Sequence, residues 1–388
     1  MKYALGLIVV FNENLFTIVN MTRVVWDGMA KPLEPSLYGL NKNNSNKDFS
    51  KPEAWGKNQF NNAFPVALSC YAYVKHIEPV YLTLDNEMKV TKSKISVDGL
   101  FGLEPLSENL FFAFESDFTP CRTMAINRLE RIDLVTMNTQ NMQNTCLRPI
   151  EIKLTALPDN ATATLSENQY GSEIVVRSPS IIYLALSIAR TYEKERSRLR
   201  DELGKVYNKS GIDWTEFNEA RPFIKELVDA IDAILESKIE GQTPFMLQPI
   251  WKTEGKTLHL NDNCFDIFVW SDFAFTRLFI DNISADHEKI SRYMRTVVWL
   301  SKMLYDYAAN GKINFKQIID TYTYGTKNDK AFATNGNVTN PYMACDELTT
   351  PRIGKFELKN IILGGGEKFL SPERRLDAAI LASPELFE

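Results

Sequence analysis

The stretch that decides the fold is Pro149-Ile150-Glu151-Ile152-Lys153-Leu154, which follows Arg131-Ile132-Asp133-Leu134-Val135 along the chain. Charged and apolar residues alternate in both stretches, and this alternation predicts β-strands, because successive side chains of a strand point to opposite faces. We therefore expect Glu151 and Lys153 on one face and the apolar residues between them in a core. Asp133, on the preceding strand, is expected to lie beside them.

Two carboxylates and a lysine at one end of a sheet are the working groups of a Mg²⁺-dependent phosphodiesterase. Water attacks a phosphodiester only when it is partly deprotonated and the developing charge is neutralised, and Mg²⁺ held by carboxylates does both. Because Mg²⁺ keeps most of its waters, two carboxylates and a backbone carbonyl suffice to hold it. On this hypothesis Asp133 and Glu151 are metal ligands, the Ile152 carbonyl is a third, and Lys153 positions or activates the attacking water.

The acid-x-lysine triplet alone is a weak signal, since it recurs at Glu87-Met88-Lys89, Glu236-Ser237-Lys238, Glu254-Gly255-Lys256 and Glu357-Leu358-Lys359. Glu357 is the strongest rival, because it has apolar neighbours and an upstream acid, Asp346, although Asp346 lies in a loop-like segment. The structural alternative for Glu151 and Lys153 is a solvated strand face with a weak ion pair, and the pattern alone favours it. The corresponding alternative for Asp133 is a surface acid at a strand end.

Composition and charge bound the class of protein. The chain has 388 residues, of which 44% are hydrophobic and 24% charged, so it is globular, with two or three domains or one elaborated domain. Its net charge of −5 argues only weakly against nucleic-acid binding, because a basic cleft can lie on an acidic surface. Scattered cysteines apart from isolated histidines argue against structural zinc and fit a reducing cytoplasm. No stretch has the roughly 18 consecutive apolar residues that span a bilayer, so no membrane association is expected.

Periodicity and turn signals predict an order of elements along the chain. We expect a helix opened by the capping box at residues 50–53, and one long helix over 179–206. The other expected elements are strands at 79–84 and 88–95, two strands that occupy 122–157 with a polar connection at 138–145, helical structure over 214–238, a strand at 265–270 and an amphipathic helix at 287–308.

Seven blocks of the chain, taken together, resemble a known protein family. They are Ser45-Asn46-Lys47-Asp48-Phe49-Ser50-Lys51, Trp55-Gly56-Lys57-Asn58-Gln59-Phe60-Asn61, Phe64-Pro65, Glu151-Ile152-Lys153-Leu154-Thr155-Ala156-Leu157-Pro158-Asp159, Asp329-Lys330-Ala331-Phe332-Ala333, Pro351-Arg352-Ile353 and Leu370-Ser371-Pro372-Glu373-Arg374-Arg375-Leu376-Asp377. These blocks resemble HindVP-type restriction endonucleases, and the resemblance runs from about residue 35 to residue 380, which is most of the chain.

This resemblance implies a type II restriction endonuclease that cuts double-stranded DNA with Mg²⁺, at a six-base palindrome of the GRCGYC kind. It also implies a restriction-modification system, with a cognate DNA methyltransferase as genetic partner. Carried over residue by residue, Glu151 and Lys153 occupy the E-x-K positions of the PD-(D/E)xK motif. Asp133 matches the upstream acid, with Ile132 where the motif's proline often stands.

We accordingly expect an α/β fold with a PD-(D/E)xK restriction-endonuclease-like core, in which helices flank a mixed central sheet, and with additional α+β recognition segments. The expected division is an N-terminal extension at 1–35, a nuclease core at 36–210, and a region at 211–388 that completes the fold and contacts DNA. A single domain is the alternative. Because a palindrome has two-fold symmetry, a homodimer is expected.

The expected DNA contacts are basic residues of the C-terminal half, namely Lys330, Arg352, Arg374 and Arg375. Arginine suits bidentate contact with guanine, whereas surface charge is the structural alternative. Two other functions stay open at this point. One is a different PD-(D/E)xK nuclease, for repair or for a DNA structure, and the other is a non-catalytic DNA-binding defence protein.

Overall fold

The computed structural model describes the chain in segments. These are residues 72–140, 145–152, 174–238, 242–249, 267–284, 291–326 and 330–334, with short strands at 253–254, 257–258, 263–265 and 353–354. The helix expected from the capping box at 50–53 lies outside the described residues.

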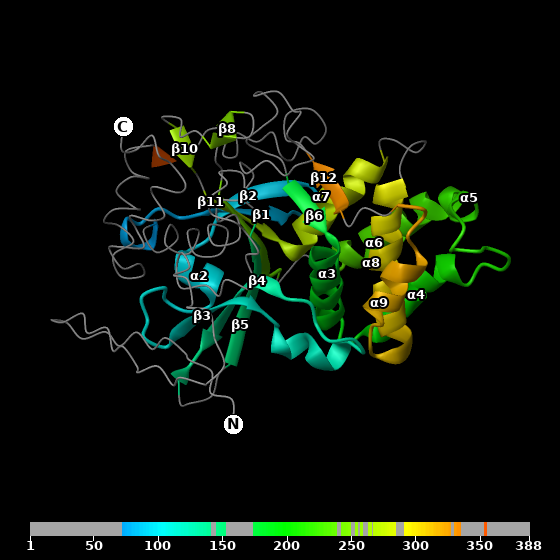
Figure 1. Ribbon diagram of the computed structural model, residues 1–388, viewed down its shortest axis with the longest axis horizontal. Coiled ribbons are helices and arrows are strands. Elements are labelled where there is room, and N and C mark those ends of the chain that lie inside the picture. The colour runs from blue at the N-terminus through cyan, green and yellow to red at the C-terminus, as the bar shows by residue number, and fades with distance from the viewer. Residues whose placement is uncertain are drawn as a thin grey trace, which may run out of the picture.

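A seven-stranded mixed sheet organises the fold, in the order β2-β1-β11-β7-β5-β4-β3 (Figure 1). β1 pairs in parallel with β11 and β5 in parallel with β7, whereas the other neighbours are antiparallel. The strands are β1 (Val80–Leu84), β2 (Val90–Lys94), β3 (Leu110–Ser116), β4 (Ile132–Asn138), β5 (Thr145–Ile152), β7 (Pro244–Pro249) and β11 (Ile267–Ser271). The predicted mixed sheet flanked by helices is confirmed.

The burial of each strand follows its place in the sheet. β1 has a neighbour on each side and one better-covered face, so Val80, Leu82 and Leu84 are buried while the residues between them are half-exposed. Every residue of β11 is buried, as expected for an apolar strand in the middle of a sheet that is covered on both faces. Because β7 and β11 lie between β1 and β5, the sheet takes strands from both sides of residue 210.

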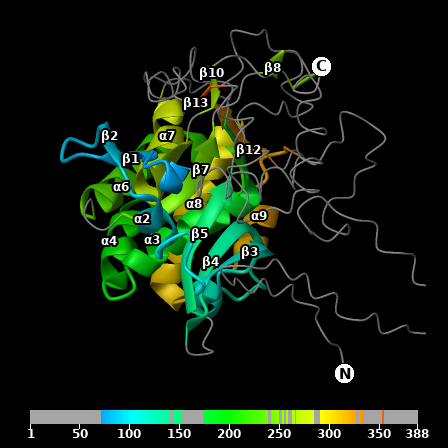
Figure 2. The same cartoon turned by 90° about the vertical axis from the view of Figure 1, so that its left-hand side faces the viewer.

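A layer of helices packs against one face of the sheet and forms most of the core (Figures 1 and 2). The long helices are α3 (Ser178–Thr191), α4 (Arg196–Tyr207), α6 (Ile224–Glu236), α7 (Asp272–Ser284) and α8 (Ser291–Asn310). α3 contacts both β4 and β5: its apolar residues from Ile181 to Ile188 are buried in the same cluster as Val135 of β4, and Ser180 donates a hydrogen bond to Glu151 of β5.

Short elements complete the described fold. α2 (Val97–Phe101) lies against the opposite face of the sheet, where the Phe101 carbonyl accepts a hydrogen bond from Thr136 Oγ1 at 2.8 Å. The others are η4 (Thr119–Met124), β6 (Ile174–Arg177), α5 (Phe217–Ala220), η7 (Arg221–Phe223), β8 (Thr253–Glu254), β9 (Thr257–Leu258), β10 (Asn263–Phe265), α9 (Phe315–Thr321), β12 (Lys330–Thr334) and β13 (Ile353–Gly354).

Most predicted elements are confirmed, and two need correction. The single helix expected over 179–206 is wrong, because α3 ends at Thr191 and α4 begins at Arg196. Tyr192 is fully buried at this break and donates its hydroxyl hydrogen bond to the Ile234 carbonyl of α6 at 2.5 Å. The first of the two strands expected over 122–157 also starts later than predicted. β4 begins only at Ile132, and a 3-10 helix precedes it.

Candidate active site

The candidate site begins where β4 and β5 run side by side. Their antiparallel register places Leu134 opposite Ile150. The same register places Asp133 opposite Glu151, and residues that oppose each other across antiparallel strands share a face of the sheet. The two carboxylates that the sequence singles out therefore lie at facing positions on one side of the sheet, at the beginning of β4 and the end of β5.

Asp133 contacts the backbone of β5 directly. The Ile152 N–H donates a hydrogen bond to Asp133 Oδ2 at 2.8 Å, so the carboxylate occupies the place where a backbone carbonyl of β4 would continue the pairing. On its other side the end of β5 pairs with β7, with Glu151 beside Met246. An amide that donates to a carboxylate makes a stronger hydrogen bond than one between neutral groups, so Asp133 is held close to Glu151.

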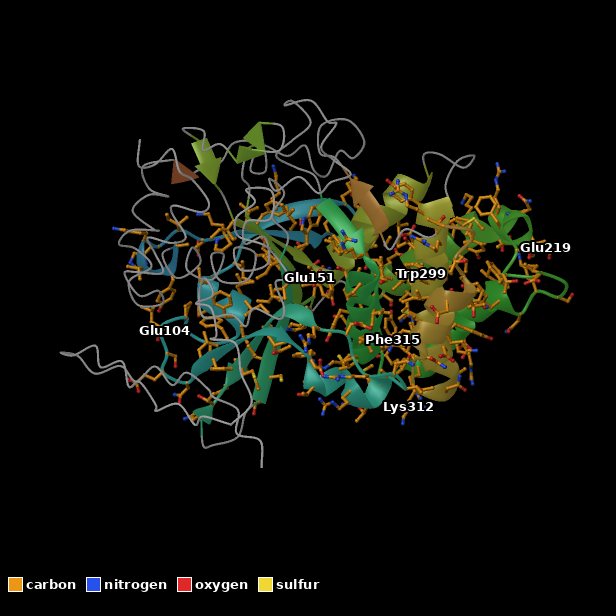
Figure 3. All side chains as sticks on the ribbon, viewed as in Figure 1. Glu104, Glu151, Glu219, Trp299, Lys312 and Phe315 are labelled. Carbon is orange, nitrogen blue, oxygen red and sulfur yellow. The ribbon has the colours of Figure 1, made fainter. Side chains whose placement is uncertain are left out.

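Glu151 is buried, with only 7% of the residue exposed. Figure 3 labels Glu151 where the sheet meets α3. Its Oε1 accepts a hydrogen bond from Ser180 Oγ at 2.7 Å. Ser180 is in the first turn of α3, where the positive end of the helix dipole favours a carboxylate. A solvated strand face is therefore the wrong interpretation of Glu151. Burying a carboxylate is costly unless it is hydrogen-bonded, and α3 supplies that bond.

α3 also holds the chain that leads into β4. Tyr183 donates its hydroxyl hydrogen bond to the Glu130 carbonyl at 2.5 Å and accepts one from the Phe118 amide at 3.3 Å. Burial raises the pKa of Tyr183, so the side chain stays a phenol and keeps its proton to donate. Because Glu130 lies three residues before Asp133, this contact helps to fix the position of Asp133.

A second buried carboxylate contacts α3 farther along the helix. Asp272 lies at the start of α7 and accepts hydrogen bonds from Ser187 Oγ at 2.5 Å, from the Phe273 amide at 2.9 Å and from Thr243 Oγ1 at 3.2 Å. Burial raises the pKa of Asp272 from 3.8 to about 6. This acid is distant in sequence from β4 and β5, and its hydrogen bonds tie α3 to the junction of β11 and α7.

The donor set at Asp133 and Glu151 fits a divalent cation of the magnesium class. Such hard cations prefer oxygen ligands and keep several waters, so two carboxylates on facing strand positions meet their needs. Within the described residues no group of three or more histidine, cysteine or acidic side chains is arranged for a metal. A cation of this class keeps several waters, so water and substrate oxygens would join these two carboxylates in its shell.

The remaining predicted site residues lie at the limits of what the structure describes. Lys153 follows the last described residue of β5, so its placement is outside the described residues. The backbone of Lys330 belongs to β12 and pairs with Arg177 of β6, but its side chain is not among those described. Arg352, Arg374 and Arg375 also lie outside the described residues.

Sequence reasoning missed the polar side chains of α3, of which Ser180 contacts the candidate site. Ser180, Tyr183 and Ser187 stand three and four residues apart in an otherwise apolar stretch, and this spacing puts them on one face of a helix. The signal was therefore present as a polar stripe on a helix with a buried face.

Among the helices that the structure describes, none combines the length and the apolar character that a membrane span requires.

Known proteins are similar to this chain over most of its length. The family model of the HindVP restriction endonuclease matches residues 55–387. The chain is 46% identical over 356 residues to the type II restriction enzyme HgiDI of Herpetosiphon aurantiacus, an alignment that covers 92% of this chain and 98% of that protein. It is 42% identical over 357 residues to the probable type II restriction enzyme HindVP of Haemophilus influenzae, which covers 92% and 96%. No solved structure matches the chain.

Proposed function

The chain belongs to the HindVP restriction endonuclease family, and on that premise we propose that it is a type II restriction endonuclease that hydrolyses phosphodiester bonds at a specific site in double-stranded DNA. Near full-length similarity to two proteins named as type II restriction enzymes carries this proposal. The facing carboxylates Asp133 and Glu151 support it independently, because they are the groups that metal-assisted hydrolysis needs.

The chemistry divides between the chain and a bound ion. Asp133 and Glu151 would hold Mg²⁺, which supplies neutralisation of phosphate charge and a more acidic water when it is bound. The chain's own contribution is preorganisation: the Ile152 amide holds one carboxylate and Ser180 holds the other. Lys153 would point to the same face as Glu151, where its ammonium would position the attacking water and contact the phosphate.

A PD-(D/E)xK fold is part of this proposal. Its support is an acid at the start of one strand, a glutamate at the end of the antiparallel neighbour that begins a Glu-x-Lys triplet in the sequence, and a helix that contacts both strands of the mixed sheet. The central sheet takes strands from both sides of residue 210, and this interleaving supports one domain over a division at that point.

The recognition site and partners are finer parts of the same proposal. We expect a palindrome of the GRCGYC kind, a homodimer that places one active site on each strand, and a cognate methyltransferase in a cytoplasmic restriction-modification system. Lys330, Arg352, Arg374 and Arg375 remain the proposed DNA contacts.

The experiment is incubation of the full chain with unmethylated plasmid that carries GRCGYC sites, with Mg²⁺ and, separately, with EDTA. The proposal predicts discrete fragments that disappear with EDTA and with Glu151→Gln. Intact plasmid under every condition would contradict it. Cleavage that requires a lesion or a junction in a panel of defined duplexes would identify a repair or structure-specific nuclease instead. Sequence-specific DNA binding without any cleavage would indicate a non-catalytic defence protein.

A further inference from the structure

α3 presents three polar side chains to its neighbours from one face. Ser180 donates to the Glu151 carboxylate, Tyr183 to the backbone that enters β4, and Ser187 to the Asp272 carboxylate. The serine hydroxyls lie two helical turns apart, and both contacts join a helix residue to a buried acid of another element. The helix is thereby tied to β5 at one end of this face and to the first residue of α7 at the other.

The contact of Ser180 differs from the other two because its partner is a candidate metal ligand. We propose that Ser180 is a positioning residue for Glu151, whose hydroxyl holds Oε1 so that the carboxylate meets a divalent cation in one orientation. This inference rests on the proposed function, because it takes Glu151 as a ligand. Ser180 itself contacts neither the cation nor the DNA in this account.

Burial and rigidity make the hydroxyl hard to replace. Ser180 has no exposed surface, so a water molecule from bulk solvent has no direct access to take the place of a deleted hydroxyl. Its backbone belongs to the first turn of a 14-residue helix, whose own backbone hydrogen bonds fix the direction of the hydroxyl. A glutamate has three rotatable side-chain bonds, so a hydrogen bond from a fixed donor removes freedom that ion binding would otherwise have to remove.

In metalloproteins, hydrogen bonds to the side chains that bind the metal affect metal affinity and activity. Loss of such an outer partner typically costs 10- to 100-fold, roughly, in metal affinity or activity. We therefore expect Ser180→Ala to raise the dissociation constant for Mn²⁺ about tenfold or more, and to raise the Mg²⁺ concentration for half-maximal cleavage by a similar factor. Ser180→Thr keeps a hydroxyl and is expected to restore much of both.

The matched control is Ser187→Ala. It makes the same substitution in the same helix and also deletes a hydrogen bond to a buried carboxylate, but that carboxylate is Asp272. A purely structural role for Ser180 predicts that the two alanine variants behave alike. Our proposal predicts that both lower the melting temperature, whereas only Ser180→Ala weakens Mn²⁺ binding.

The test has two measurements on the full-length protein. The first is a Mn²⁺ titration in which electron paramagnetic resonance measures the free ion. The second is plasmid cleavage as a function of Mg²⁺ concentration. Wild-type affinity in Ser180→Ala, or equal loss in Ser187→Ala, would overturn the proposal. If Ser180→Ala does not fold, as judged by circular dichroism, Ser180→Cys replaces it, because its thiol is a similar size and a weak donor. A wild-type Mn²⁺ affinity in Ser180→Cys would likewise overturn it.

Glu151→Gln separates this proposal from the proposed function. If that variant binds Mn²⁺ and cleaves DNA as the wild type does, Glu151 is not a ligand and the proposed active site fails with the inference. If Glu151→Gln is inactive while Ser180→Ala matches the wild type in Mn²⁺ affinity, the active site stands and only the positioning role of Ser180 is lost.

Discussion

The Ile152 amide donates a hydrogen bond to Asp133 Oδ2 at 2.8 Å, which ties the side chain of one candidate ligand to the backbone next to the other. Ile152 directly follows Glu151, so the two carboxylates cannot separate without breaking this bond or bending β5. The pair is therefore a property of the strand pairing of β4 and β5, whose register sets both positions.

Replacing Asp133 by asparagine separates its charge from its hydrogen bond. The amide oxygen of Asp133→Asn can still accept from Ile152, so the melting temperature is expected to change little. Loss of the carboxylate is expected to reduce plasmid cleavage at least about 100-fold, because a metal ligand is removed. Thermal denaturation and cleavage assays measure the two effects. A large fall in melting temperature with normal cleavage would show that Asp133 is structural.

Tyr183→Phe tests the contribution of α3 to the entry into β4. The variant leaves the Glu130 carbonyl and the Phe118 amide without their phenol partner, so we expect a loss of about 1–3 kcal/mol in the free energy of unfolding. Urea denaturation measures it. The matched control is Tyr305→Phe, whose hydroxyl hydrogen bond to Asn208 Oδ1 is exposed, and which should cost less. Equal costs would contradict this role of Tyr183.

The raised pKa of Asp272 predicts a specific pH dependence of the protein's stability. Burial raises its pKa from 3.8 to about 6, so the folded state binds a proton that the unfolded state releases between these values. Its contribution to stability is therefore present below about pH 4 and is lost as the pH rises through about 6. Asp272→Asn removes this dependence.

We expect the difference in unfolding free energy between Asp272→Asn and wild type to rise in favour of the variant from pH 4 to pH 7, by up to about 3 kcal/mol. Denaturant titrations at several pH values measure the difference. The contributions of the titratable groups that both proteins share cancel in it. A difference that stays constant with pH would show that Asp272 titrates normally.

Lys302 of α8 predicts the opposite dependence at alkaline pH. Its ammonium lies 3.8 Å from the ring centroid of Tyr207 and within 6 Å of the Trp214 and Tyr322 rings. Burial lowers the pKa of Lys302 to about 8, although the ring faces stabilise the cation and oppose part of this effect. Between about pH 8 and pH 10 the unfolded state binds the extra proton, so this lysine's contribution to stability grows as the pH rises.

Lys302→Met keeps the shape of the aliphatic chain and removes the titration. Relative to this variant, the wild type is expected to gain stability from pH 7.5 to pH 10, as measured by urea denaturation. A parallel pH dependence of the two proteins would contradict a lowered pKa at Lys302.

Local sequence patterns predict those elements whose burial follows from a simple period. The alternation in β1 and in the end of β5 predicts both strands, and Ile150 and Ile152 are buried as expected. The break between α3 and α4 has no proline or glycine to announce it. It depends on the packing of Tyr192 against α6, which is a contact between residues far apart in the chain.

The site was predictable in its residue types but not in its surroundings. The spacing of Asp133 and Glu151 on adjacent strands follows from alternation, and the structure brings them to facing positions. The burial of Glu151 was not predictable, because it results from α3, whose Ser180 is 29 residues away. The parallel pairing of β5 with β7 is likewise a non-local contact that no local pattern specifies.

Cleavage of unmethylated supercoiled plasmid by four proteins (wild type, Asp133→Asn, Glu151→Gln and Asp229→Asn) decides whether the paired carboxylates form the active site. Asp229 is a matched exposed acid of α6, paired with Lys225. With Mg²⁺, we predict discrete fragments from the wild type and Asp229→Asn, and intact plasmid from folded Asp133→Asn and Glu151→Gln. Fragments of wild-type size and yield from either of these two variants would contradict the assignment of a metal-dependent active site to the paired carboxylates of β4 and β5.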